Sequence, residues 1–164
     1  MDVLDNDTVS IWDLHCHLSG VPGRTPDEQM ARFMQYADRL GIERVCIFMG
    51  SPFSANPSPG RLKEENDQVL QALTHWHDRA FGFVYVSGEH IEASLSEIDR
   101  CVRDGPMVGI KLWVAARANG PQIDPIIRRA ADLKAVIFQH TWIKTDGGNL
   151  PGESTPMDLV ELAR

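Results

Sequence analysis

Short apolar runs alternate with amphipathic segments along the whole chain. Five runs rich in β-branched and aromatic residues predict strands, and each is followed by a segment whose apolar residues recur at helical spacing. The later runs are almost wholly apolar, which is typical of parallel strands covered on both faces. The predicted strands are residues 9–17, 44–49, 81–86, 108–114 and 135–140. This alternation indicates βα units and a parallel sheet.

The ends of the predicted helices carry capping signals. Thr25 and Glu28 are spaced as a capping box around a proline, and Gly41 stands where a left-handed residue ends the same helix. Asp-Pro and Thr-Pro pairs predict that Asp124 and Thr155 cap the fourth and fifth helices. With no linker or low-complexity segment between these units, we expect one α/β domain.

Two parallel architectures remain open at this point: a doubly wound sheet and part of a (β/α)8 barrel. No strand–helix turn carries the GxGxxG or GxxxxGK[ST] pattern, so nucleotide binding has no support in the sequence.

Charge and composition exclude several classes of partner. The 164 residues carry a formal net charge of −7 and are 43% hydrophobic. An acidic chain disfavours nucleic acid and anionic membranes, and no apolar run is long enough to span a bilayer. The acidic start lacks the features of a signal peptide. The odd number of cysteines without a CxxC pattern favours core packing in a reducing cytoplasm.

The stretch DLHCHLSG holds the first candidate chemistry. Side chains alternate along a strand, so Asp13, His15 and His17 share one face. The opposite face, which we expect to pack against helices, holds Trp12, Leu14, Cys16 and Leu18. Two histidines on one strand are either a metal clip or a pair at a solvated strand end.

A third histidine, His140, ends the fifth predicted strand in the place that His15 and His17 occupy on the first. Because parallel α/β folds place their sites at the carboxyl ends of strands, the three imidazoles indicate a site for a divalent ion. Zinc is our first expectation, with manganese or iron as alternatives. We expect the remaining histidines, at 75, 77 and 90, to lie on the surface.

Candidate substrate-binding residues surround this site. Lys111 lies within the fourth predicted strand, where a lysine is costly unless it serves a site. Trp113 and Trp142 are candidate aromatic walls, and Lys144 is a candidate anchor for a small-molecule anion. Two long loops, 50–60 and 141–154, leave the carboxyl ends of their strands and are expected to cover the same pocket.

D-x-H-x-H on the first predicted strand, GIKLW on the fourth and a strand-terminal histidine on the fifth make the chain similar to the amidohydrolase-related family. Its members are metal-dependent enzymes with a (β/α)8 barrel. Because residues 1–164 hold only five predicted βα units, the resemblance implies a partial TIM barrel. It also implies that His15, His17 and His140 are metal ligands. Lys111 matches a position that is a carboxylated bridging lysine in binuclear members and is not a ligand in many others.

The resemblance also implies a histidine on a sixth strand and an aspartate on an eighth, which residues 1–164 do not contain. We therefore expect a barrel domain truncated before the sixth strand, inactive alone, with strand edges that favour homo-oligomers. The implied function is metal-dependent hydrolysis of an amide, ester or lactone of a small carboxylated molecule. The alternatives are a metal-dependent decarboxylase and an inactive metal-binding fragment. No catalytic residue is assigned.

Overall fold

The computed structural model describes residues 9–164; residues 1–8, with most of the acidic start that argued against a signal peptide, lie outside the described part. Its centre is a parallel sheet whose strand order repeats the order along the chain. The strands are β1 (Ile11–Cys16), β2 (Ile42–Phe48), β3 (Ala80–Tyr85), β4 (Gly109–Leu112) and β5 (Val136–Gln139). A doubly wound sheet reverses its strand order, whereas a barrel does not. The fold is a partial TIM barrel.

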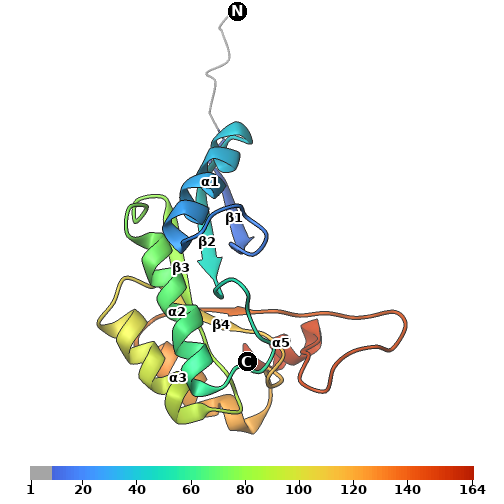
Figure 1. The fold of residues 1–164 in the computed structure, drawn as a ribbon. Coiled ribbons are helices and arrows are strands. Elements are labelled where there is room, and N and C mark those ends of the chain that lie inside the picture. Colours follow the sequence, from blue (N-terminus) through green and yellow to red (C-terminus); the bar gives the residue numbers. More distant parts are fainter. Residues whose placement is uncertain (1–8) are drawn as a thin grey trace, which may run out of the picture.

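A helix follows each strand, and Figure 1 shows α1, α2 and α3 succeeding one another along one side of the sheet. The helices are α1 (Pro26–Arg39), α2 (Pro59–Leu73), α3 (Ile91–Ile98), α4 (Asp124–Asp132) and α5 (Pro156–Leu162). A π-helical turn, Asp99–Arg103, extends α3, and a 3-10 turn, Pro121–Ile123, precedes α4.

The capping prediction is confirmed at α5, confirmed for one of the two capping-box bonds at α1, and wrong at α4. The Thr25 side chain accepts the Glu28 backbone N–H at 3.2 Å, although the Glu28 carboxylate accepts from Arg24 rather than from the cap itself. Thr155 begins α5 with a complete capping box. Asp124 does not cap α4, because the preceding 3-10 turn already makes it a helical residue.

Hydrophobic side chains form one core on each face of the sheet. The larger core fills the space between strands and helices and includes Cys16 and Leu18, as the sequence predicts. The smaller core lies on the inner face of the curled sheet, where aromatic rings predominate. It is formed by Cys46, Phe48, Met49, Leu62, Phe83 and Tyr85, with Phe53, Phe81, Ala93, Trp113 and Phe138 packed against it.

The face predicted for Trp12 is wrong. Trp12 stacks on the inner-face ring of Phe81, with centroids 5.3 Å apart and the planes nearly parallel. The pairing of β1 with β2 shifts register between Asp13 and Cys16, so simple alternation fails there. Leu14, also expected against the helices, is 53% exposed.

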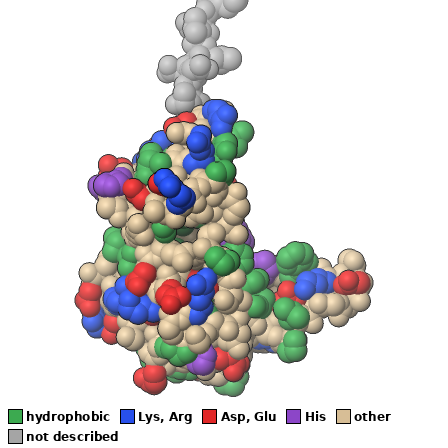
Figure 2. Space-filling view, viewed as in Figure 1, with side chains coloured by type: hydrophobic (Ala, Val, Ile, Leu, Met, Phe, Trp, Pro, Cys, Tyr) green, Lys and Arg blue, Asp and Glu red, His purple; other side chains and the backbone are tan. Residues whose placement is uncertain are grey.

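The remaining general expectations concern cysteines, membranes and charge. All three cysteines are buried and free, consistent with packing. Among residues 9–164 no helix is long and apolar enough to cross a membrane. Figure 2 shows acidic and basic side chains intermingled on the face that it draws.

Candidate metal centre

A cavity of about 380 Å³ opens at the carboxyl ends of the strands. It contains every residue that the sequence singled out for metal or substrate binding. Its lining consists of His15, His17, Met49, Phe53, Lys111, Trp113, His140, Trp142, Lys144, Leu150 and Glu153. Both long loops contribute, so the expectation that they cover the same pocket is confirmed.

The three histidines meet at this cavity although they come from strands at opposite edges of the sheet, His15 and His17 from β1 and His140 from β5. The ring centroids of His15 and His17 are 5.2 Å apart, and those of His15 and His140 are 6.2 Å apart. His15 is the last but one residue of β1, while His17 and His140 each follow a strand directly. The curl of the sheet brings these strand ends together.

The hydrogen bonds of the histidines indicate which imidazole nitrogens are available to bind a metal ion. His17 Nδ1 lies 3.2 Å from the backbone oxygen of Phe48, a contact that a protonated Nδ1 makes as donor. This leaves Nε2 of His17 with a lone pair. His140 Nε2 is buried and has no hydrogen-bond partner within residues 9–164. Asp13 Oδ1 accepts the backbone N–H of His15 at 3.0 Å and so braces the strand below the rings.

Burial keeps the three imidazoles neutral. It lowers the pKa of His17 to about 4, against a smaller opposing effect of the Phe48 carbonyl. Burial and the nearby Lys111 charge also lower the pKa values of His15 and His140. Neutral imidazole is the form that binds metal ions.

The three histidines fit a divalent ion in donor chemistry, and the spacing of His15 and His17 also suits one. Nitrogen–metal bonds of about 2.0–2.1 Å place the centres of two imidazoles on one ion roughly 5–6 Å apart. The His15–His17 spacing of 5.2 Å falls in that range, whereas the His15–His140 spacing of 6.2 Å lies above it. Within the described part of the chain, however, no three His, Cys, Asp or Glu side chains are grouped so as to hold a metal ion. Binding therefore requires the rings to turn toward a common point.

Lys111 lies in β4 and is 1% exposed. Its Nζ atom lies 4.4 Å from the ring centres of both Phe48 and Phe138 and has no hydrogen-bond partner in residues 9–164. Burial lowers its pKa to about 7, because the ammonium ion loses its hydration. Each ring face returns about 0.5–2 kcal/mol, whereas burying an ion costs several kcal/mol. Desolvation therefore dominates.

Aromatic side chains form the walls of the cavity. Trp113 is half-buried and meets the ring of Phe53 edge-on at 5.4 Å. Trp142, which is 50% exposed, tilts against the His140 ring at 5.5 Å. The cavity therefore combines flat apolar walls with the imidazole and amine groups of His15, His17, His140 and Lys111.

Lys144 does line the cavity, but it already has a partner. Its Nζ lies 2.9 Å from Glu153 Oε2 and donates to the Gly148 carbonyl at 3.2 Å. Glu153 is 5% exposed and also accepts the Leu150 N–H at 2.7 Å. The Lys144 ammonium and these bonds lower the pKa of Glu153.

Sequence reasoning missed Glu153. The residues on either side of it, Gly152 and Ser154, are the sequence feature that could have indicated its position. A Cβ at Gly152 would collide with the Val114 carbonyl oxygen, and Ser154 Oγ accepts the Ala118 N–H at 2.8 Å. The two residues flanking Glu153 thus anchor the loop to the segment after β4, which fixes the carboxylate at the cavity.

Buried polar groups hold the other long loop. Glu65 in α2 accepts the Ser54 N–H at 2.9 Å, and its carboxylate pairs with Arg61 at 3.1 Å. The Tyr85 hydroxyl donates to the Ser54 and Ala55 carbonyls at 2.9 and 3.1 Å. These bonds fix the loop that places Phe53 in the cavity wall.

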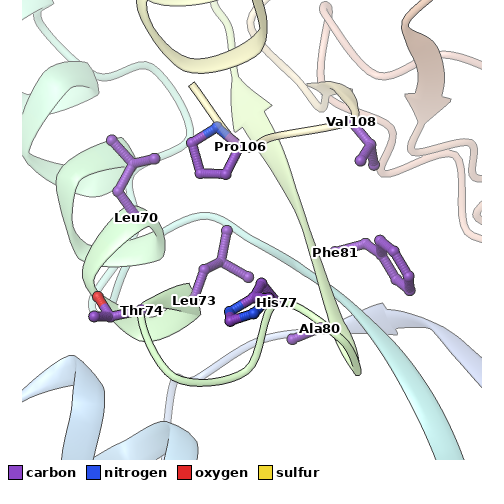
Figure 3. Close-up of a pocket in the computed structure, with 8 residues that line it drawn as sticks. All are labelled: Leu70, Leu73, Thr74, His77, Ala80, Phe81, Pro106 and Val108. Atoms are coloured by element: carbon purple, nitrogen blue, oxygen red, sulfur yellow. The ribbon is translucent and has the colours of Figure 1, made fainter. Parts of the chain in front are cut away.

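A second, larger cavity of about 550 Å³ lies at the amino-terminal ends of β3 and β4 (Figure 3). Its walls are mainly apolar and include Leu70, Leu73 and Phe81, and among the described residues that line it His77 alone is ionisable. The side chains of His75 and His77 are largely exposed, as expected. Without converging polar groups, this cavity is not the candidate site.

The fold resembles solved structures of enzymes. 2,6-Dihydroxybenzoate decarboxylase from Rhizobium matches with a TM-score of 0.64 and 17% identity, over 85% of this chain and 52% of its own. 5-Carboxyvanillate decarboxylase from Novosphingobium aromaticivorans, with bound manganese and a nitrobenzoic acid, matches at 0.61 and 22%, over 80% and 38%. An amidohydrolase II structure matches at 0.67 and 12%, over 94% and 60%.

The chain therefore spans between 38% and 60% of the length of these three proteins. A comparison with curated protein sequences finds no match. A family model described as amidohydrolase matches residues 12–164, nearly all of the part that the structure describes. Together with the parallel half-barrel and its histidine-lined cavity, this match shows that the chain belongs to the amidohydrolase family.

Proposed function

We propose that this chain forms the first five βα units of a metal-dependent hydrolase that acts on an amide, ester or lactone of a small carboxylated molecule. The observation that carries the proposal is the meeting of His15, His17 and His140 at one cavity beside Lys111. Three neutral imidazoles and an adjacent cation form a suitable environment for a metal ion and an anionic substrate.

His15, His17 and His140 would hold the ion. A divalent ion supplies Lewis acidity, which polarises a carbonyl and lowers the pKa of water. Zinc is our first choice, with manganese or iron as alternatives, because imidazole suits all three. The manganese in the 5-carboxyvanillate decarboxylase structure supports a divalent ion without selecting among them.

The other lining residues would bind and orient the substrate. Lys111 would attract a carboxylate, because its buried amine has no other acceptor within residues 9–164. Trp113 and Trp142 would pack against the apolar part of the molecule and exclude water. Lys144, already paired with Glu153, would contact the substrate at the mouth of the cavity.

A second candidate reaction is decarboxylation. Two of the solved structures that share this fold are decarboxylases of aromatic acids. The flat walls and buried cation of the cavity would also suit such an acid. In this reaction the site would orient a carboxylate, and the neighbouring carbon would be protonated.

Among residues 9–164 no carboxylate lies in the place where the family resemblance expects a proton acceptor. We therefore propose that residues 1–164 bind a divalent ion weakly and turn over no substrate at a useful rate. An inactive metal-binding role for the chain itself is the corresponding alternative.

The test has two parts. In the first, cobalt titration of the chain should give one site, with at least tenfold weaker binding after His17→Ala and unchanged binding after Cys16→Ala, because Cys16 faces the helices. Equal binding by all three proteins would exclude the site. In the second, the protein that contains the complete barrel is incubated with candidate acids in labelled water. Incorporation of labelled oxygen indicates hydrolysis, whereas release of carbon dioxide without it indicates decarboxylation.

A further inference from the structure

Glu153 presents one carboxylate oxygen to the candidate site without a bond. Both bonds of its side chain end on Oε2, which accepts the Leu150 N–H at 2.7 Å and pairs with Lys144 Nζ at 2.9 Å. Within residues 9–164, Oε1 has no hydrogen-bond partner but keeps accessible surface. Only 5% of the residue is exposed, and it lines the cavity. The carboxylate therefore offers the cavity a hydrogen-bond acceptor that no group of the described chain uses.

We propose that Glu153 Oε1 determines substrate specificity by accepting a hydrogen bond from a hydroxyl group of the substrate. The proposal rests on the proposed function, since it takes the substrate to be a small carboxylated molecule bound in this cavity. It narrows the substrate class to acids that carry a hydroxyl group on a flat apolar frame.

Backbone bonds hold this carboxylate in place. The Glu153 N–H donates to the Leu150 carbonyl at 2.9 Å, and the Trp142 N–H donates to the Ser154 carbonyl at 2.9 Å. Ser154 Oγ in turn accepts the Ala118 N–H at 2.8 Å. An acceptor fixed in this way selects a donor by position, because it cannot follow a group placed elsewhere on the ligand.

The pairing with Lys144 determines which kind of group Oε1 binds. A glutamate paired with a lysine is ionised at neutral pH, so Oε1 accepts hydrogen bonds and has no proton to donate. The ion pair has no net charge and therefore holds little attraction for a cation. A second carboxylate or an ether oxygen of the ligand would face Oε1 lone pair to lone pair. A hydroxyl group satisfies it, because O–H bonds to a carboxylate are short and strong.

The remaining walls define the frame of the ligand. The rings of Phe53 and Trp113 meet edge-on at 5.4 Å, and Trp142 adds a further flat surface. A cavity of about 380 Å³ accommodates an acid of one aromatic ring. The proposed function places the carboxylate of the substrate beside Lys111, which leaves a hydroxyl group elsewhere on the ring to meet Glu153. Hydroxybenzoates are therefore suitable probes.

The test measures the binding of benzoate, the three monohydroxybenzoates and the corresponding methoxybenzoates to the complete 164-residue chain. NMR titration of the ligand signals detects weak binding, and a chelator removes metal ions that a hydroxyl group could otherwise ligate. We expect at least one hydroxybenzoate to bind about tenfold more tightly than both benzoate and its own methoxy counterpart, because hydrogen bonds to charged groups contribute that factor or more.

Glu153→Gln distinguishes a hydrogen bond from an effect of ligand size. Because the Leu150 N–H still requires an acceptor, the amide oxygen of glutamine takes the place of Oε2, and its NH2 group takes the place of Oε1. An acceptor thus becomes a donor in a side chain of nearly the same shape. The preference for the hydroxy acid over the methoxy acid should fall to within about twofold, because the rejection of the analogue depends on the acceptor. A preference caused by the larger methoxy group would remain.

Asn149→Ala is the matched control for the order of the loop. Asn149 accepts the Lys144 N–H at 3.0 Å and donates to the Trp142 carbonyl at 3.2 Å, and it does not line the cavity. This variant removes two bonds from the loop but keeps the Glu153 carboxylate. It should therefore keep the preference for the hydroxy acid.

The outcomes separate this proposal from the proposed function. If benzoate binds but no hydroxybenzoate is preferred, or if the preference survives in Glu153→Gln, the role of Glu153 is refuted and the acid site stands. Loss of the preference in both variants would assign it to loop order and also overturn the proposal. If none of the acids binds, the acid site of the proposed function fails together with this inference.

Discussion

Lys144 and Glu153 lie at the two ends of the loop after β5, and their side chains meet at 2.9 Å beside the candidate site. The lysine is partly exposed, whereas the carboxylate is nearly buried. Figure 1 shows this loop extending away from the body of the fold, and Asn149 also links its two sides, accepting the Lys144 N–H at 3.0 Å and donating to the Trp142 carbonyl at 3.2 Å. The ion pair is therefore one of the bonds that join the two sides of the loop.

Breaking this pair should loosen the loop. In Glu153→Gln the charge-assisted bond to Lys144 is lost, and such bonds contribute about 1.5–3 kcal/mol. We expect trypsin to cleave after Lys144 about three- to tenfold faster, as followed by the appearance of the fragment that ends there. Glu64→Gln is the control, because Glu64 forms an exposed pair with Arg61 in α2. Equal acceleration in both variants would contradict a specific restraint.

Gly152 should tolerate no side chain. A methyl group there would collide with the Val114 carbonyl oxygen, so Gly152→Ala should lower the free energy of unfolding by about 1–3 kcal/mol. Gly60→Ala is the matched control. Gly60 lies in the first turn of α2 with open space around it, and alanine there should stabilise the chain by about 0.4–1 kcal/mol. Urea denaturation measures both, and opposite signs are expected.

Asn66 should be essential for the packing of α2 on β3. Its side chain donates to the Tyr85 carbonyl at 3.1 Å and to Glu97 at 3.0 Å, and it accepts the Tyr85 N–H at 2.8 Å. Asn66→Ala removes the partner of the buried Tyr85 backbone groups, while Glu97 keeps its pair with Arg100, and the substitution should cost about 2–4 kcal/mol of stability. Asn119→Ala removes an exposed bond to Glu161 and should change stability by less than about 0.5 kcal/mol. Similar losses in the two variants would show that burial does not determine the effect.

The start of α5 should be sensitive to acid. Asp158 accepts the Thr155 N–H at 2.7 Å, and this bond lowers the pKa of the Asp158 carboxyl. A lowered folded-state pKa means that the stabilisation is complete above the ordinary aspartate pKa. It is lost as the pH falls through the folded-state value. Thermal unfolding between pH 7 and pH 2 should show this loss, and Asp158→Asn should remove that part of the pH dependence while lowering stability at pH 7.

The sequence alone determined the elements and most of the candidate site. Apolar runs and capping residues predicted each of the five strands and the helices between them, because these signals depend on neighbouring residues. His15 and His17 were predicted to share a face because alternation along a strand is local. His140 was predicted to meet them because parallel strands end at the same edge of a sheet.

The tertiary structure decided what depends on contacts between distant segments. Trp12 turned to the inner face because β1 and β2 shift register, which no pattern within β1 reveals. The choice of a barrel over a doubly wound sheet depended on strand order, a property of pairing rather than of any strand.

Glu153 gives the clearest contrast. Within its loop it is one carboxylate among several, and it reaches the cavity only because Gly152 and Ser154 dock on the segment after β4. For Lys111, too, the sequence and the tertiary structure each supplied one part of the description. Its presence in an apolar strand marked it as unusual, but its isolation between Phe48 and Phe138 follows from three strands brought together by the curl of the sheet. Local periodicity identifies which side chains face inward, and only the packed strands determine which of them meet.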